Sequence, residues 1–153
     1  MRSVFRAIWD HALRPLTSRP PALQVAALCH RKGKNGTEVL LVSSSSGRWI
    51  LPKGWPIDGL TAAESAQQEA WEEGGVEKAR ADEAGAETIQ SEKRFEDGLT
   101  IPCEVKVFPV KVKKVARDFP EKHRRKRLWV APERAAEIVD EPALSDALRR
   151  FAG

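Results

Sequence analysis

The sequence predicts an α/β or α+β sandwich, in which a mixed β-sheet carries helices on its faces. Two observations favour this class. Short apolar segments bounded by turn residues are typical of strands, and three later segments have the composition or the start signals of helices. The 153 residues fit one domain of ordinary size. A chain of this length buries a hydrophobic core without disulfide or metal staples.

The first part of the expected sheet is a β-hairpin. Residues 22–31 (ALQVAALCHR) and 37–44 (TEVLLVSS) are apolar runs. Lys32–Gly36 between them contains an Asn-Gly pair, a strong signal for a tight turn. A serine loop leads to a short strand at residues 48–51 (RWIL), and a rigid loop bracketed by Pro52 and Pro56 follows.

A helix is expected to open at Thr61. Thr61 and Glu64 have the spacing of a capping box, in which each side chain bonds a free backbone amide of the first turn. The following residues have strong helix propensity. Gly74 and Gly75 end the helix, because glycine adopts the left-handed backbone that a helix end favours.

The second half predicts two long strands, one short strand and two helices. Residues 86–95 and 99–115 read as strands joined near Asp97-Gly98, with a bulge where the alternation of residues 105–112 is imperfect. Residues 126–130 (KRLWV) form another strand. Helices follow over residues 132–141, which begin with proline, and over residues 141–153.

Charge and cysteine usage restrict the class of protein. The net charge is +4, of which +3 lies in the first twenty residues, so a uniformly basic nucleic-acid binder is disfavoured. Cys29 and Cys103 lie among apolar residues and form no paired motif, which favours burial in a reducing compartment. No run approaches the roughly 20 apolar residues that span a bilayer. A cytoplasmic location is therefore expected.

Residues 1–20 are expected to form an N-terminal amphipathic helical extension. Apolar residues recur at helical spacing among arginines, and they are Val4, Phe5, Ile8, Trp9 and Leu13. A short helix packing on the domain is the favoured interpretation. An organelle transit peptide and a membrane-surface helix remain the alternatives, although Asp10 and His11 interrupt the cationic pattern of a transit peptide.

Three carboxylates on the expected helix form a candidate metal site. Glu69, Glu72 and Glu73 are spaced i, i+3 and i+4, so they emerge from one face and repel each other. No lysine or arginine occurs between Lys53 and Lys78 to neutralise them. A hard divalent cation such as Mg²⁺, which prefers oxygen ligands, would do so. The alternative is a solvated acidic helix face.

This stretch resembles the signature of the Nudix hydrolase family, which reads glycine, five residues, glutamate, seven residues, then Arg-Glu-apolar-x-Glu-Glu-x-Gly-apolar. Gly54 matches the first glycine, and the second part is matched by Glu69, Ala70, Glu72, Glu73, Gly75 and Val76. Leu60 and Gln68 depart from it, standing where the family has glutamate and arginine. The resemblance covers about residues 22–151 and implies a Nudix-like α/β/α sandwich, with residues 21–153 as the Nudix hydrolase domain.

The resemblance implies a metal-dependent reaction. Gly54, through its carbonyl, and Glu69, Glu72 and Glu73 would bind Mg²⁺, with Mn²⁺ as a substitute, and the three glutamates would be catalytic. Water would attack phosphorus in a diphosphate linkage. One of these glutamates, or a loop acid, would take the proton of the water. The loop candidates are Glu96, Asp97 and Glu121.

Six further residues are candidates for substrate binding. Arg48 and Lys53 flank the short strand before the box, Ser44 and Ser45 offer hydroxyls, and Arg125 and Arg127 lie at the end of a basic run. For each, a solvated surface position is the alternative. No aromatic residue is interleaved with the basic run, so RNA is a less favoured partner than a phosphorylated small molecule.

The sequence therefore predicts a Mg²⁺-dependent pyrophosphohydrolase that cleaves a nucleoside polyphosphate, a dinucleoside polyphosphate or a diphosphoinositol polyphosphate. Segments 38–56 and 125–139 resemble diphosphoinositol polyphosphate phosphohydrolases, and Pro52–Gly54 also resembles diadenosine tetraphosphate hydrolases. Residues 21–28 and 96–102 lack the basic residues that diphosphoinositol polyphosphate phosphohydrolases carry there, which favours diadenosine polyphosphates as the substrate class. The alternative is a non-catalytic Nudix-fold module that binds a ligand or RNA. A homodimer is left open.

Overall fold

The computed structural model describes residues 22–95 and 97–153. The strands are β1 (Ala22–Gly33), β2 (Gly36–Ser43), β3 (Trp49–Ile50), β4 (Lys53–Gly54), β5 (Val76–Ala81), β6 (Glu87–Arg94), β7 (Thr100–Val115) and β8 (Arg127–Val130). The helices are α2 (Ala62–Gly74), α3 (Pro132–Ile138) and α4 (Pro142–Ala152). The helical extension predicted for residues 1–20 lies outside the described residues.

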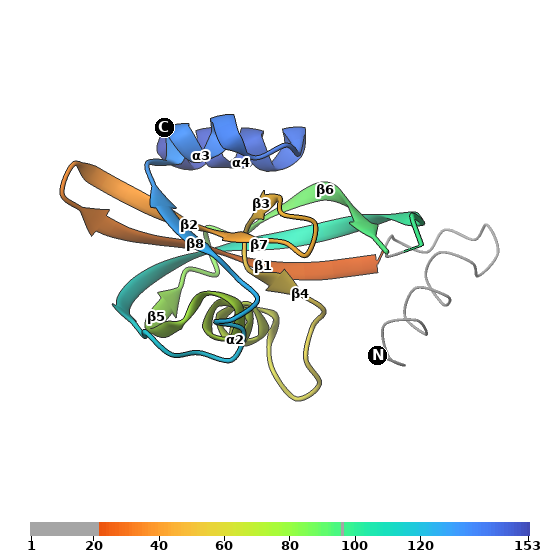
Figure 1. Cartoon of the computed structure of the whole chain (residues 1–153), viewed down its shortest axis with the longest axis horizontal. Coiled ribbons are helices and arrows are strands. Elements are labelled where there is room, and N and C mark those ends of the chain that lie inside the picture. Colours follow the sequence, from red (N-terminus) through yellow and green to blue (C-terminus); the bar gives the residue numbers. More distant parts are fainter. Residues whose placement is uncertain (1–21, 96) are drawn as a thin grey trace.

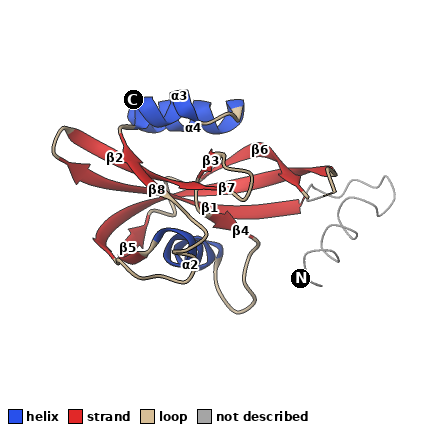
Figure 2. Cartoon of the chain, in the orientation of Figure 1, coloured by secondary structure: helices blue, strands red, loops and turns tan. Residues whose placement is uncertain are grey.

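These elements form three layers, with α2 on one face of a mixed sheet and α3 and α4 on the other (Figure 2). The strand order is β3-β2-β1-β7-β5, with β4 paired to β1, β6 to β7 and β8 to β2. β1 and β7 pair in parallel from Ala22↔Cys103 to His30↔Lys111, and the other pairs are antiparallel (Figure 1). The predicted α/β sandwich is confirmed.

The predicted strands of the first hairpin are present, and the turn between them is tight. Gly33 pairs with Gly36, so only Lys34 and Asn35 form the turn. Two strands were not predicted. β4 lies inside the segment expected to be a rigid loop, and β5 follows directly after the glycines that end α2.

The imperfect alternation in β7 has a physical reason, which is that both faces of this strand are covered. Val105 and Val107 belong to the core under α3 and α4, whereas Phe108 and Val110 belong to the core under α2. The pairing of β7 with β1 runs without a shift through this region. The irregularity lies further along, where β5 pairs with residues 112–115 of β7.

The start and end of α2 follow the sequence signals. The Thr61 hydroxyl accepts from the Glu64 amide at 3.1 Å, and the Thr61 amide donates to the Glu64 carboxylate at 2.8 Å. Gly75 ends the helix with φ 71°, and its amide donates to carbonyls of the last turn. α2 is thereby fixed at both ends, which sets the direction of the side chains along it.

We expect Thr61→Ala to lower the free energy of unfolding by about 1 kcal/mol, because it leaves an amide of the first turn without its side-chain acceptor. Urea denaturation followed by circular dichroism measures this change. Thr61→Ser keeps the hydroxyl and should stay close to wild type. An equal decrease in the free energy of unfolding of both variants would contradict a capping role for the Thr61 hydroxyl.

The structure also bears on what the sequence indicated about the cysteines and about membrane-spanning segments. Cys29 and Cys103 are free and buried, as predicted. Within residues 22–95 and 97–153, no helix combines the length and apolar character needed to cross a membrane.

Candidate active site

Glu69, Glu72 and Glu73 form a carboxylate cluster in the C-terminal half of α2, which faces the short strand β4. Glu69 lies directly against Gly54: a Cβ atom built on Gly54 would be 2.3 Å from Glu69 Oε1. Any residue larger than glycine at position 54 would therefore displace this carboxylate. The pairing of Gly54 with Val25 on the central strand β1 fixes the position of the glycine. This close approach gives Gly54 a steric reason to be glycine.

Glu73 is held by a backbone amide and by a guanidinium group. The Lys53 amide donates to Glu73 Oε1 at 3.3 Å, and Arg125 Nη2 lies 3.4 Å from Glu73 Oε2. Arg125 also donates to the Glu121 carboxylate at 2.9 Å and to the Ser43 carbonyl at 2.7 Å. A single arginine thus connects α2, the end of β2 and the segment before β8.

Glu72 is oriented by its neighbour on the helix. The Gln68 side-chain amide donates to Glu72 Oε2 at 2.8 Å. The Glu121 amide donates to the Glu72 carbonyl at 2.9 Å, which places the Glu121 carboxylate at the end of α2. Glutamine at position 68 therefore still supports a carboxylate, without supplying a charge. Leu60, the other departure from the box, is 41% exposed.

Two carboxyls of the cluster favour their protonated form. Burial raises the pKa of Glu73 to about 8, with added repulsion from Glu69 and Glu121, although Arg125 opposes the rise. Burial raises the pKa of Glu69 to about 7, and the negative charges of Glu72 and Glu121 add to it. Among the described residues, Arg125 is paired with Glu73 and Glu121 and lowers the pKa values of both Glu69 and Glu73, but burial outweighs it.

Glu69 also has an unpaired atom. Its Oε2 is buried and has no hydrogen-bond partner among residues 22–95 and 97–153. In the part of the chain that the structure describes, no three His, Cys, Asp or Glu side chains already converge on one point as metal ligands. Glu72 and Glu73 are instead held by Gln68 and Arg125. Glu69 is the carboxylate that has an oxygen free to accept a new partner.

The sequence matches the NUDIX domain over residues 20–151. The chain belongs to the Nudix family. It is 34% identical over 116 residues to the Arabidopsis thaliana protein "Nudix hydrolase 16, mitochondrial", covering 72% of this chain and 63% of that protein. It is 33% identical over 120 residues to "Nudix hydrolase 12, mitochondrial" from the same plant, covering 76% and 59%. The chain thus spans less than two thirds of the length of these relatives.

A protein of known structure has a similar fold. The Ap4A hydrolase of C. elegans, solved as a binary complex, superposes with a TM-score of 0.67 at 23% identity, covering 86% of this chain and 95% of that one. At this identity the likeness supports the Nudix fold alone. It agrees with the three layers described above.

Two of the predicted substrate-binding residues of this Nudix domain, Arg125 and Lys53, contact the carboxylate cluster. Arg125 lies on the carboxylate cluster, and Lys53 contacts it through its amide. The Lys53 side chain lies on the other face of the sheet, in a small cavity with Ser91 and Glu141, where burial lowers its pKa. The hydroxyl of Ser91 bonds Glu141 in that cavity. Neither Ser91 nor Glu141 had a signal in the sequence.

The turn between β2 and β3 carries Arg48, Ser44 and Ser45. The Ser44 hydroxyl accepts from the Arg48 amide at 3.0 Å, and the Arg48 side chain lies 3.5 Å from Asp140. Ser45 is exposed. The structure does not bring these three residues into contact with the carboxylate cluster through any described hydrogen bond or ion pair.

Arg127 has a structural position at the end of α2. It donates to the Gly74 carbonyl at 3.1 Å and the Ala116 carbonyl at 2.9 Å, and its guanidinium lies 4.6 Å from the centre of the Phe119 ring. Its charge thus meets the negative end of the helix.

The described loop acids differ in position. Asp97 accepts from the Leu99 amide in the β6–β7 turn, and Glu96 lies outside the described residues. Of the two described loop acids, Glu121 is the one linked to the cluster, through Arg125 and through its amide bond to the Glu72 carbonyl.

Proposed function

We propose that the chain is a Mg²⁺-dependent pyrophosphohydrolase that cleaves a diphosphate linkage by attack of water on phosphorus. One observation carries this proposal. The Glu69 carboxylate lies against Gly54 with a buried oxygen that has no partner, beside two further glutamates on the same face of α2. Membership of the Nudix family supports the same conclusion.

The residues present fit a divalent cation. All candidate donors are oxygens, namely the carboxylates of Glu69, Glu72 and Glu73 and the carbonyl of Gly54, which suits Mg²⁺ or Mn²⁺. Burial is the main cause of the raised pKa values of Glu69 and Glu73, and the negative charges of neighbouring glutamates add to it. When bound, the cation would polarise phosphoryl oxygens and lower the pKa of a water molecule.

In this proposal, side chains of this chain bind the phosphate, accept the proton and orient the glutamates. Arg125 is the base placed to meet phosphate oxygens beside the glutamates, because its charge already faces Glu73 and Glu121. Glu121 is the loop acid placed to accept the proton of the attacking water. Gln68 orients Glu72, and the Lys53 amide orients Glu73.

Diadenosine polyphosphates are the substrate class we favour, followed by diphosphoinositol phosphates and 5′-triphosphate RNA. The Pro52–Gly54 segment supports the first class. The first strand argues against an inositol polyphosphate clamp, since the described residues of its N-terminal half, from Leu23 to Ala27, include no base.

A substrate panel with Mg²⁺ tests this proposal. Wild type and Glu73→Gln are compared on diadenosine tetraphosphate, a diphosphoinositol phosphate, ADP-ribose and 5′-triphosphate RNA, with Glu77→Gln as the matched control. Glu77 is an acid on β5 paired with Lys114 at 3.1 Å. We expect turnover by wild type and Glu77→Gln only. Equal turnover by Glu73→Gln would refute the metal site, and RNA binding without any turnover would favour the non-catalytic module.

Gly54→Ala should weaken Mn²⁺ binding and the hydrolysis rate by about tenfold or more, the scale seen when the support of a metal ligand is lost. The added methyl group would displace the Glu69 carboxylate, which lies 2.3 Å from its position. Calorimetry and steady-state rates measure the two effects. Gly153→Ala, whose methyl group would lie 3.7 Å from its nearest neighbour, is the control.

We also propose a cytoplasmic location, which the two buried free cysteines support. The proposed division is an extension over residues 1–20 and a Nudix hydrolase domain over residues 21–153. Analytical ultracentrifugation of the full chain would decide whether it forms a homodimer.

A further inference from the structure

A concave surface lies at the end of β1 that is distant from Gly54, where β1 and β7 separate. Their parallel pairing stops at His30 and Lys111, although β1 continues to Gly33 and β7 to Val115. Figure 1 shows the β1–β2 hairpin and the end of β7 diverging beyond this point. The space between them is a notch of about 680 Å³, which is the size of a small-molecule site. We call it the β1–β7 notch.

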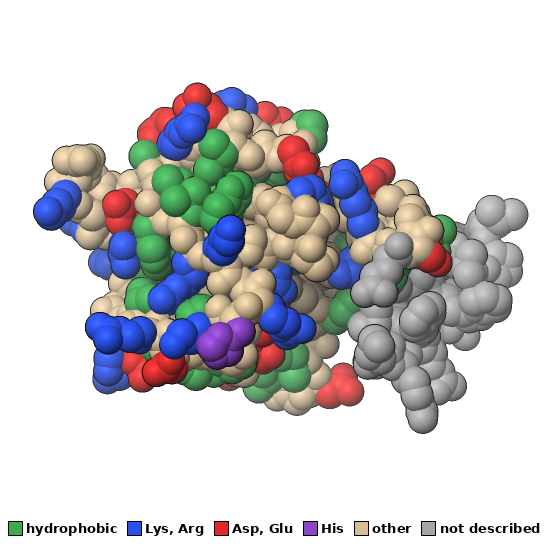
Figure 3. Space-filling model, viewed as in Figure 1, with side chains coloured by type: hydrophobic (Ala, Val, Ile, Leu, Met, Phe, Trp, Pro, Cys, Tyr) green, Lys and Arg blue, Asp and Glu red, His purple; other side chains and the backbone are tan. Residues whose placement is uncertain are grey.

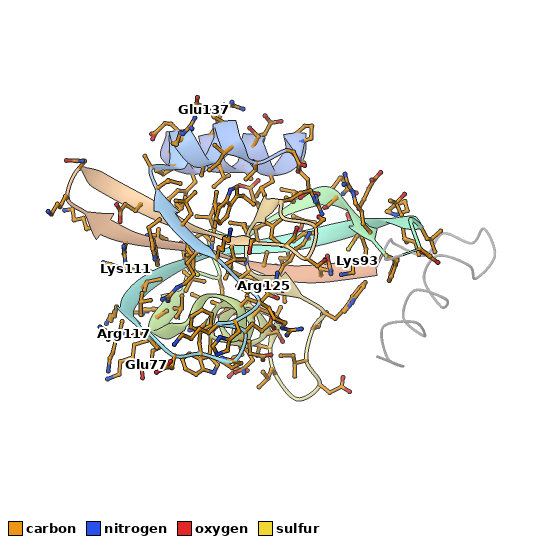
Figure 4. The ribbon with its side chains drawn as sticks, viewed as in Figure 1. Glu77, Lys93, Lys111, Arg117, Arg125 and Glu137 are labelled. Atoms are coloured by element: carbon orange, nitrogen blue, oxygen red, sulfur yellow. The ribbon has the colours of Figure 1, made fainter. Side chains whose placement is uncertain are left out.

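Five of the eight residues that line the β1–β7 notch are basic. They are His30, Arg31 and Lys32 from β1 and Lys111 and Lys113 from β7, with Thr37 and two valines, and no acid lines it. Figure 3 shows lysine and arginine side chains gathered over this end of the molecule, and Figure 4 labels Lys111 within it. A concave surface with one sign of charge concentrates the electrostatic potential.

Most of this charge is unbalanced. Arg31 is paired with Glu38 at 3.1 Å and lies 3.9 Å from the centre of the Trp129 ring. Lys32, Lys111 and Lys113 take part in none of the ion pairs among the described residues. Burial and the charge of Lys111 lower the pKa of His30, while Asp82 opposes this. The notch therefore has positive charge available for a ligand.

The chemistry of the lining favours linked phosphates over a nucleic acid. Lysine donates charge-assisted hydrogen bonds to phosphate oxygens, and a neutral histidine ring can donate one N–H. The eight described lining residues include no Phe, Trp or Tyr, and the two nearby rings are already in contact with lining side chains, Trp129 with Arg31 and Phe151 with His30. The notch is also separate from the carboxylate cluster, because Lys32 lies seven residues along β1 from Val25, the partner of Gly54, or roughly 20 Å away.

We propose that the β1–β7 notch is a second anion-binding site, which takes a short chain of linked phosphate groups and works independently of the catalytic glutamates. Inorganic tripolyphosphate is the probe. Binding to the full chain is measured by calorimetry in EDTA at low salt, so that no divalent cation can hold the anion at the glutamates. Ring signals of His30 are followed by NMR in the same titration.

Lys111→Gln with Lys113→Gln should raise the Kd for tripolyphosphate at least about tenfold and remove the shift of the His30 signals, because charge-assisted contacts are lost. Lys114→Gln with Arg134→Gln removes the same charge from exposed positions outside the notch and should change the Kd less than about twofold. Glu73→Gln should bind as wild type does.

Three outcomes would overturn the proposal. The first is equal weakening by the two double variants, which would indicate a general charge effect. The second is tripolyphosphate binding without movement of the His30 signals. The third is a single-stranded RNA that binds more tightly than tripolyphosphate and depends on Lys111 and Lys113, which would assign the notch to nucleic acid.

Discussion

Glu69→Gln is expected to lower the rate of hydrolysis by about 100-fold or more, the scale of losing one group that stabilises charge in a transition state. The substitution keeps the size of the side chain and removes the charge from the carboxylate against Gly54. The concentration of Mg²⁺ needed for half-maximal activity should rise at the same time. Steady-state rates over a series of Mg²⁺ concentrations measure both effects.

The same variant should not lose stability without metal. Burial raises the pKa of Glu69 to about 7, so the folded protein gains little from its charge and a neutral amide fits the site. Glu77→Gln, at an exposed carboxylate on β5, should keep both activity and metal dependence. A Glu69→Gln protein that is fully active, or that is inactive because it is unfolded, would contradict the assigned role.

Stability without divalent cations is expected to fall as the pH rises from about 5 to 8. The pKa of Glu73 rises from 4.5 in the unfolded chain to about 8 in the folded protein. Between these values the folded state binds more protons than the unfolded state, so the free energy of unfolding decreases with pH. Glu73 is buried, and it alone should contribute about 3 kcal/mol over this range.

Urea denaturation at several pH values in EDTA measures this slope. Glu73→Gln should flatten it, whereas Glu77→Gln should leave it unchanged. Mg²⁺ should stabilise the protein more at pH 8 than at pH 6, because the ligands must lose their protons to bind the cation. A slope that is the same in wild type and Glu73→Gln would show that another group is responsible.

The sequence predicted α2 and its carboxylates well because the signals there are local. The capping pair Thr61 and Glu64, the glycines that end the helix and the spacing of the three glutamates all lie within one segment. Backbone geometry alone then places the glutamates on one face. The first hairpin was predictable for the same reason, since its turn chemistry sits between two apolar runs.

The parts that the sequence did not predict depend on distant residues. β5 (VEKARA) exposes three of its six side chains and becomes a strand through pairing with β7. β4 spans only two residues and exists because β1 pairs with it. Arg127 was a candidate for substrate binding, yet the carbonyls of Gly74 and Ala116 hold it at the end of α2. Each outcome is set by tertiary contacts that no local pattern encodes.

The parallel pairing of β1 with β7 has a consequence for how the chain folds. Ala22 pairs with Cys103, which is 81 residues further along, so the centre of the sheet closes only after a long loop has been ordered. Domains dominated by such non-local contacts fold on the millisecond to second scale. During synthesis, α2 and its glutamates leave the ribosome well before β7 does. The first hairpin must therefore wait for β7 beside β1 and for β8 beside β2, and these unpaired edges expose the nascent chain to aggregation.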